Sequence, residues 1–448
     1  MTSWKRLIVG CTFIFPAIAA LASPSGLLDI YQHAQRGDPD FGAAVANYQA
    51  GLKTQDIGLA GLLPSVSASV SSTRNRYGLE TTALPWADYN FTSRVQTIQL
   101  TQSIFDWEKI SAYNEASALT ELSKAIFAEA KADLIVRVAQ GYFGYLLAND
   151  NLEMAEAQKT ALAQQRIQAE KLYKSGVGTI TDVEETKARY EISDAQLLAA
   201  SGTLDVRRRE LEKMTGAMPG DIHRITGSFK MAVPEPLNVT VWLEAAARQN
   251  LRVISQQLNL RVAEIQVDKG WAGHLPSLDL VASRQKGSAP NYFTNSDSSS
   301  RVGLQLSMPL YEGGKVTGMN EQAFFRKEKA RHELESAVRD SQIKVSQAYL
   351  GVVNGIAQVK ALEQAVKSGE TTLQGMKVGQ RTGFRTNTDV LNAQQQLFVT
   401  QRDLQQQRYN YLLNRLQLQA ETGSLNDESV VLIDSLISQA KQTGHSSK

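Results

Sequence analysis

The two halves of this 448-residue chain repeat one another, and this duplication constrains the fold more than any local motif. The matching stretches keep one order and a spacing of 206 to 207 residues, as from 98 to 304 (206) and from 182 to 389 (207). They are Ile98–Thr101 with Leu304–Ser307, Ile104–Asp106 with Leu310–Glu312, Lys109 with Lys315, Gln140 and Tyr142 with Gln347 and Tyr349, Thr181–Val183 with Thr388–Val390, and Thr215–Gly216 with Thr422–Gly423. Upstream, Leu63–Ser65 matches Leu275–Ser277 at a spacing of 212, so we expect a polar loop of variable length over 71–94.

Each half has the same predicted order of a helix, a strand hairpin and a long helical hairpin. The first repeat (23–216) is predicted to hold them over 27–60, 64–105 and 106–215, and the second repeat (239–423) over 241–272, 276–311 and 312–422. A proline-containing connector over 217–238 joins the repeats, and the tail over 424–448 is its expected irregular counterpart.

The strand signal is clearest between Val302 and Leu310, where every second residue is large and apolar. These residues are Val302, Leu304, Leu306, Met308 and Leu310, and smaller or polar residues separate them. Alternation with period two indicates a strand with one apolar and one polar face. We expect strands of about 9 to 11 residues, including 94–105 and 301–311.

The helical hairpins are predicted from stretches without proline, which breaks helix interiors at a cost of about 3 kcal/mol. One helix from Asp106 to Lys174 would be about 100 Å long at 1.5 Å per residue. Gly176, Gly178 and Gly383 are expected to end the outgoing helices. A capping box of Thr181 with Glu184 is expected to start the first returning helix, and Thr386 or Thr388 the second.

The N-terminus and the composition narrow the class of protein. Residues 1–22 have the charged start, apolar run and small-residue end of a secretory signal peptide, so we expect export. Cys11, within that segment, is the only cysteine, so no disulfide is expected in the mature chain. A net charge of +2 gives no electrostatic reason to expect nucleic acid. No later run of about 18 apolar residues predicts a spanning helix, so a membrane role would need strands.

Two interpretations of the strands remain open at this point. Four amphipathic strands of this length fit an outer membrane, with Val302, Leu304, Leu306, Met308 and Leu310 facing lipid. Four strands cannot enclose a lumen, and open edges are not tolerated in lipid, so several copies would share one barrel. Three copies give twelve strands. The alternative is a four-stranded sheet packed on helices in a soluble protein.

Several motifs resemble the signature stretches of the TolC family of outer-membrane efflux and type I secretion channels. They are Leu100–Asp106, Gly273–Leu280, Pro309–Gly314, Gly383 with Thr388–Leu391, Tyr409–Leu412 and Thr422–Asn426. The resemblance implies a homotrimer with a twelve-stranded barrel in the outer membrane, continued by an α-helical barrel across the periplasm. It also implies that the connector and the tail form a belt around the helices. Small molecules or unfolded protein would leave through the pore, driven by an inner-membrane RND or ABC transporter joined through a periplasmic adaptor.

The resemblance also implies roles for residues at the hairpin tips. Asp182 and Arg385 align with residues whose polar links hold the periplasmic end shut, although Asp182 is also where a helix start favours an acid. Gln380 replaces the tyrosine that takes part in these links. A pore-lining acidic pair corresponds to Asp389 and Asn392, so one carboxylate of that ring is lost. The positions expected to contact the adaptor are Gly176, Gly178, Thr181, Gly383 and Thr386.

Enzymatic chemistry is not expected. The five histidines are scattered without metal-ligand spacing, and no nucleophile–base grouping is evident, so we predict no enzyme activity, metal or cofactor. The alternatives to a channel are a periplasmic adaptor, which also uses a long helical hairpin, and a helical scaffold. The residues do not identify the cargo.

Overall fold

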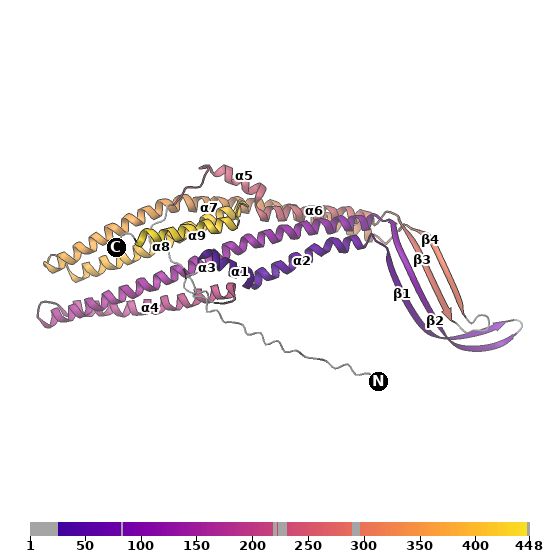
Figure 1. Ribbon diagram of the computed structural model, residues 1–448, viewed down its shortest axis with the longest axis horizontal. Coiled ribbons are helices and arrows are strands. Elements are labelled where there is room, and N and C mark those ends of the chain that lie inside the picture. The colour runs from indigo at the N-terminus through magenta and orange to yellow at the C-terminus, as the bar shows by residue number, and fades with distance from the viewer. Residues whose placement is uncertain (1–25, 82–83, 218–221, 223–230, 289–295, 446–448) are drawn as a thin grey trace, which may run out of the picture.

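The computed structural model describes residues 26–81, 84–217, 222, 231–288 and 296–445. The predicted signal peptide, with Cys11, therefore lies outside the described residues, as does much of the connector. The elements, in chain order, are α1 (Leu27–Gly37), α2 (Pro39–Ala60), β1 (Ser65–Thr81), β2 (Leu84–Phe105), α3 (Trp107–Lys174), α4 (Ile180–Thr215), α5 (Val239–Gln249), α6 (Leu251–Ala272), β3 (Ser277–Ser288), β4 (Asp297–Ser307), α7 (Lys315–Arg381), α8 (Asn387–Glu421) and α9 (Asp427–His445). The molecule is long and narrow, with the strands at one end and both helical hairpin tips at the other (Figure 1).

The duplicated sequence gives a duplicated order of elements, two helices, two strands and a helical hairpin in each half. The single leading helices predicted over 27–60 and 241–272 were wrong, because each is broken in two. The first helix breaks at Asp38, because the ring of the following Pro39 cannot continue a helix. The Asp38 side chain caps α2 by accepting a hydrogen bond from the N–H of Asp40. Asn250 breaks the second and caps α6 through the N–H groups of Arg252 and Val253.

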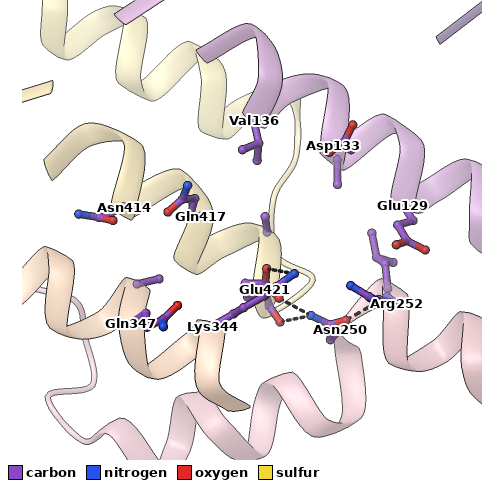
Figure 2. A pocket seen from close by; sticks show the side chains of 14 residues that line it. Glu129, Asp133, Val136, Asn250, Arg252, Lys344, Gln347, Asn414, Gln417 and Glu421 are labelled. Carbon is purple, nitrogen blue, oxygen red and sulfur yellow. Dashed lines mark hydrogen bonds and ion pairs between the residues drawn. The ribbon is translucent and has the colours of Figure 1, made fainter. Parts of the chain in front are cut away.

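Asn250 also joins the start of α6 to the end of α8. Its side-chain amide donates to the backbone carbonyl of Glu421 and to the Glu421 carboxylate, both at 2.9 Å. Figure 2 shows this contact at the edge of an open pocket between α3, α6, α7 and α8. The break between α5 and α6 is therefore held against the end of α8, the returning helix of the same repeat.

The four strands form one antiparallel sheet in the order β1-β2-β3-β4. β3 and β4 have 12 and 11 residues, close to the expected length, but β1 has 17 and β2 has 22. The polar loop predicted over 71–94 was wrong, because the ladder continues to the pair Thr81 and Leu84. Since β3 ends opposite Arg94, the outer part of this hairpin extends past β3 and β4 as two strands (Figure 1).

The predicted end of the strand over 301–311 was also wrong. β4 ends at Ser307, so Met308 and Leu310 lie in the segment that leads to α7. Pro309 has no N–H to donate to a ladder, which explains the early end. Gly313 and Gly314 then take positive φ angles of 63° and 83°, which allow the chain to enter the helix.

The two long helices confirm the prediction from the proline-free stretches. α3 has 68 residues and α7 has 67, so each is about 100 Å long. α4 and α8 return beside them, and Gly176 and Gly383 take left-handed conformations, with φ of 76° and 80°, just after the outgoing helices. Among the described residues, no helix combines the length and the apolar character that crossing a membrane requires.

The capping box predicted for Thr181 and Glu184 was wrong. Thr179 caps α4, and its partner is Asp182. The same arrangement recurs in the second half, where Thr386 caps α8 with Asp389. In each half a second threonine, Thr181 or Thr388, lies two residues after the capping threonine and directly before the aspartate. The helix begins at the earlier threonine because the glycine turn ends there.

The core lies midway along the molecule, where the N-terminal and C-terminal helices cover the long hairpins. Its largest fully buried side chains include Tyr142, Phe143, Tyr409, Tyr411 and Leu412. The tail, expected to be irregular, instead forms α9 from Asp427, with Val430, Ile433 and Ile437 buried in this core. Their spacing of three to four residues places one helical face on the core.

Candidate functional site

The sheet has one apolar and one polar face over the part formed by all four strands. Val302, Leu304 and Leu306 are 77%, 68% and 71% exposed, and they lie directly opposite Ala282, Leu280 and Leu278. We call this side of the sheet the apolar face. Gln99, Thr101, Gln305 and Ser307 lie on the opposite side, as predicted from the alternation. Met308 and Leu310, 55% and 88% exposed, continue the apolar sequence pattern beyond the end of β4.

Both outer edges of the sheet are open. Within the described part of the chain, β1 pairs only with β2 and β4 only with β3. An edge of 17 residues on one side and 11 on the other therefore carries backbone groups that no strand satisfies. An open edge of this kind can pair with a strand of another chain. In lipid such pairing is necessary, because no water satisfies the free backbone groups.

The two hairpin tips lie side by side at the other end of the molecule (Figure 1). Gly176, Thr181, Gly383 and Thr386 are exposed there, and Gly178 is half-buried. Each tip also presents an apolar side chain that the sequence reasoning missed. Val177 is 78% exposed and Phe384 is 87% exposed, and they occupy equivalent positions of the two repeats, 207 residues apart (384 minus 177). This equivalence can be read from the sequence repeat, and it could have identified the two apolar side chains.

The predicted gate residues are brought to the tips but are not joined within one chain. The Asp182 carboxylate accepts hydrogen bonds from the hydroxyl and the N–H of Thr179. The Arg385 side chain packs against Gly379. A Cβ added to Gly379 would lie 2.7 Å from the Cγ of Arg385. Gln380 donates to the side-chain carbonyl of Asn387 at 3.0 Å. Among the described residues, no ion pair links Asp182 to Arg385, so such a pair would need a second copy of the chain.

The two residues predicted for the acidic ring differ in their surroundings. Hydrogen bonds from the N–H and the hydroxyl of Thr386 hold the pKa of the Asp389 carboxyl below its usual value. Asn392 instead accepts a hydrogen bond at 2.8 Å from the guanidinium of Arg189 on α4. The position that lacks a carboxylate therefore has a cation as its partner, which lowers the negative charge there further.

Arg189 belongs to a set of polar contacts between the two hairpins that the sequence reasoning missed. The Thr388 hydroxyl donates to Glu185 at 2.7 Å, and the Asn387 amide donates to the Thr186 hydroxyl at 3.2 Å. Arg189 also donates to Glu185 at 3.0 Å. We call the contacts of Glu185, Thr186 and Arg189 with α8 the hairpin link. Arg189 follows Thr186 by three residues and Glu185 by four, so the three side chains share one face of α4. This spacing is the local signal that they act together.

The chain matches the family model of the outer membrane efflux protein over residues 30–217 and 242–424, that is, over both repeats. It is 32% identical to the alkaline protease secretion protein AprF of Pseudomonas aeruginosa, covering 94% of this chain and 90% of AprF. It is 30% identical to the proteases secretion protein PrtF of Dickeya chrysanthemi, covering 95% of this chain and 94% of PrtF. The fold matches the Campylobacter jejuni CmeC outer membrane channel with a TM-score of 0.79 at 15% identity, covering 92% and 89% of the two chains.

These matches run through both repeats, confirm the resemblance inferred from the motifs and decide against the adaptor and scaffold alternatives. The chain therefore belongs to the outer membrane efflux protein family, the TolC family, and is an outer-membrane channel protein of efflux or type I secretion rather than an enzyme.

Proposed function

We propose that three copies of this chain form one channel, with β4 of each copy paired to β1 of the next. The observation that carries this proposal is the four-stranded sheet with two open edges and an exposed apolar face. Twelve strands leave a water path, whereas four cannot close, and pairing around the ring satisfies every edge. Val302, Leu304, Leu306, Met308 and Leu310 would then contact lipid, and the polar face would line the pore.

The helical hairpins would continue the pore into the periplasm for about 100 Å, since α3 and α7 are single helices of that length. The connector over 217–238 and the tail over 424–448 would form the belt around the helices. The tips are where such a tube can close. Asp182 of one copy would pair with Arg385 of a neighbour, Gln380 would support the second tip, and Asp389 would supply the remaining carboxylate of the pore ring beside Asn392.

We infer that the cargo is protein rather than small molecules. The support is that AprF and PrtF, two relatives that are 32% and 30% identical to this chain, are protease secretion proteins. In type I secretion the energy comes from an ABC transporter, so the adaptor of such a transporter would dock on Gly176, Gly178, Thr181, Gly383 and Thr386. Exposed apolar side chains beside these positions, Val177 and Phe384, give a partner surface to bury.

Two measurements test these proposals separately. The mature chain should resist carbonate extraction, purify in detergent as a trimer and form channels in planar bilayers, whereas a stable water-soluble monomer would refute the channel. Cells that lack the chain should lose a secreted protein from the medium while keeping their antibiotic resistance. Unchanged secretion with lowered resistance would refute protein as the cargo and assign an RND pump as the partner instead.

A further inference from the structure

The apolar face changes character abruptly toward the free end of the sheet. Ala282 lies opposite Leu100 and Val302, but two residues further along, Arg284 lies opposite Ile98 and Ser300. Lys286 follows in the next row and Arg94 in the row after it, where Arg94 lies opposite Ser72 and Ser288. Arg74 occupies the row beyond, opposite Thr92. We call Arg74, Arg94, Arg284 and Lys286 the basic rim.

The basic rim lies on the apolar face, because residues directly opposite one another in adjacent strands point to the same side. All four side chains are exposed. Successive rows are about 7 Å apart, since two residues of a strand rise by that much, so the four cations span about 20 Å along the strands. They come from three adjacent strands, which brings them within reach of one ligand or of a few neighbouring ones.

The cations of the basic rim have no ion-pair partner among the described residues. A fifth cation of this face, Arg76, differs from them, because its guanidinium contacts the Asp88 carboxylate at 2.8 Å. Asp88 is the only carboxylate on this face of the sheet whose side chain the structure describes. The rim therefore keeps an uncompensated charge of +4 from its four cations. This charge makes it a candidate site for anions.

The other end of the sheet is electrostatically different. There Lys109, at the start of α3, lies 3.5 Å from the Asp106 carboxylate and 3.7 Å from that of Asp279. The cation at the helical end is thus neutralised by the chain itself, whereas those at the free end are not. Because the helices extend from the first end (Figure 1), the free end is the one that faces the outside of the cell in the proposed channel.

The position of the rim relative to lipid follows from the cost of burying charge. A cation on the lipid-facing side of a barrel is strongly destabilising at the bilayer midplane and close to neutral at the interface. Unpaired cations directly beyond the apolar rows must therefore lie where hydrocarbon ends and headgroups begin. Arginine binds phosphate with two parallel hydrogen bonds, and unpaired cations at a membrane surface attract anionic headgroups.

We propose that the basic rim binds the phosphate groups of the glycolipid in the outer leaflet, the lipid A portion of lipopolysaccharide. The chemistry of recognition is phosphate on a membrane-anchored sugar, with the acyl chains lying against the apolar rows below. This inference rests on the proposed function, because it requires the apolar face to contact lipid.

The test uses the full mature chain in mild detergent and three probes, namely bisphosphorylated lipid A, the same lipid A without phosphates, and phosphatidylglycerol. Binding is counted by native mass spectrometry. Wild-type protein should retain bisphosphorylated lipid A at least about tenfold more tightly than the dephosphorylated form. Equal binding of those two forms would overturn the proposal. Equal binding of phosphatidylglycerol would overturn its assignment to the glycolipid.

The variant Arg94→Gln/Arg284→Gln/Lys286→Gln should lose at least about tenfold in affinity for bisphosphorylated lipid A. The matched control is Arg301→Gln, an exposed cation of the same sheet on the polar face opposite Ser283, which should bind as the wild type does. An equal loss of lipid A affinity in both variants would refute the assignment of binding to the basic rim. The wild-type comparison of lipids decides the question even where the triple variant does not assemble. Wild-type protein that forms channels but ignores phosphate would overturn this inference alone, whereas protein that forms no channel would overturn the proposed function.

Discussion

In the proposed channel, we expect the hairpin link to make the closed state sensitive to Arg189. This residue donates to Asn392 at 2.8 Å and to Glu185 at 3.0 Å, so it connects α4 to α8 close to both tips. We expect Arg189→Met to loosen the closed tips, because the variant keeps the apolar stem of the side chain but loses both contacts. This loosening is expected if opening moves the second hairpin away from the first, which would break the contact to Asn392.

The magnitude follows from the exposure of the contact. A hydrogen bond to a charged group contributes about 1.5–3 kcal/mol when well buried. The Arg189 side chain is 27% exposed and its partner Asn392 is exposed, so solvent screening lowers this to about 1 kcal/mol per chain. Three copies in the proposed trimer give about 3 kcal/mol, or a roughly hundredfold higher ratio of open to closed states.

Single-channel recording in planar bilayers measures this ratio directly from the times spent at high and low conductance. The matched control is Arg207→Met on the same helix, since Arg207 pairs within α4 with Glu210 at 2.7 Å and both side chains are 46% exposed. We expect wild-type behaviour from the control and long openings from Arg189→Met. If the two variants show the same conductance and the same dwell times, the hairpin link has no part in closing the channel.

Three further outcomes are expected. Arg385→Ser should raise the conductance and antibiotic uptake by removing the proposed pair between neighbouring copies, and a variant with neither change would remove the gate assignment. Because the pKa of Asp389 is lowered in the fold, its carboxylate stabilises the native state above the ordinary aspartate pKa, and this contribution disappears as the pH falls through the lowered value. The difference in thermal midpoint between wild type and Asp389→Asn, followed by circular dichroism, should therefore shrink in acid, and a constant difference would contradict it. Leu146→Ala, at a fully buried position, should destabilise the helical core by about 2–5 kcal/mol, whereas Leu198→Ala, 77% exposed, should change denaturant unfolding little; similar losses would place the core elsewhere.

The features that were predictable from the sequence are those fixed by local chemistry. Missing prolines allowed 68- and 67-residue helices, and glycines at 176 and 383 marked their ends, because a left-handed residue there costs glycine little. Period-two alternation predicted the apolar face of β4 because side chains of a strand must alternate. These rules act over a few residues and need no knowledge of distant contacts.

The features that were missed depend on distant partners. The break at Asn250 has no proline to announce it, and it is held by Glu421, 171 residues away. The hairpin link joins positions 203 residues apart, Arg189 and Asn392, and their register is set by how two long helices pack. Helix α9 also depends on distant partners, because its stability comes mainly from packing on the core that it covers.

The distribution of buried surface fits the proposal that this chain both assembles with other copies and opens at its tips. The chain exposes 28430 Å², whereas a compact protein of its 49.2 kDa would expose about 17,000 Å². Most of the fully buried side chains, such as Tyr142 and Tyr409, lie midway along the molecule, and the two ends keep exposed apolar residues, such as Leu304 and Phe384. Few buried apolar side chains lie at the ends, so the ends are the parts that are available to join other copies. In the proposed trimer, a rigid middle between them would let the tips separate while the strands stay paired in the membrane.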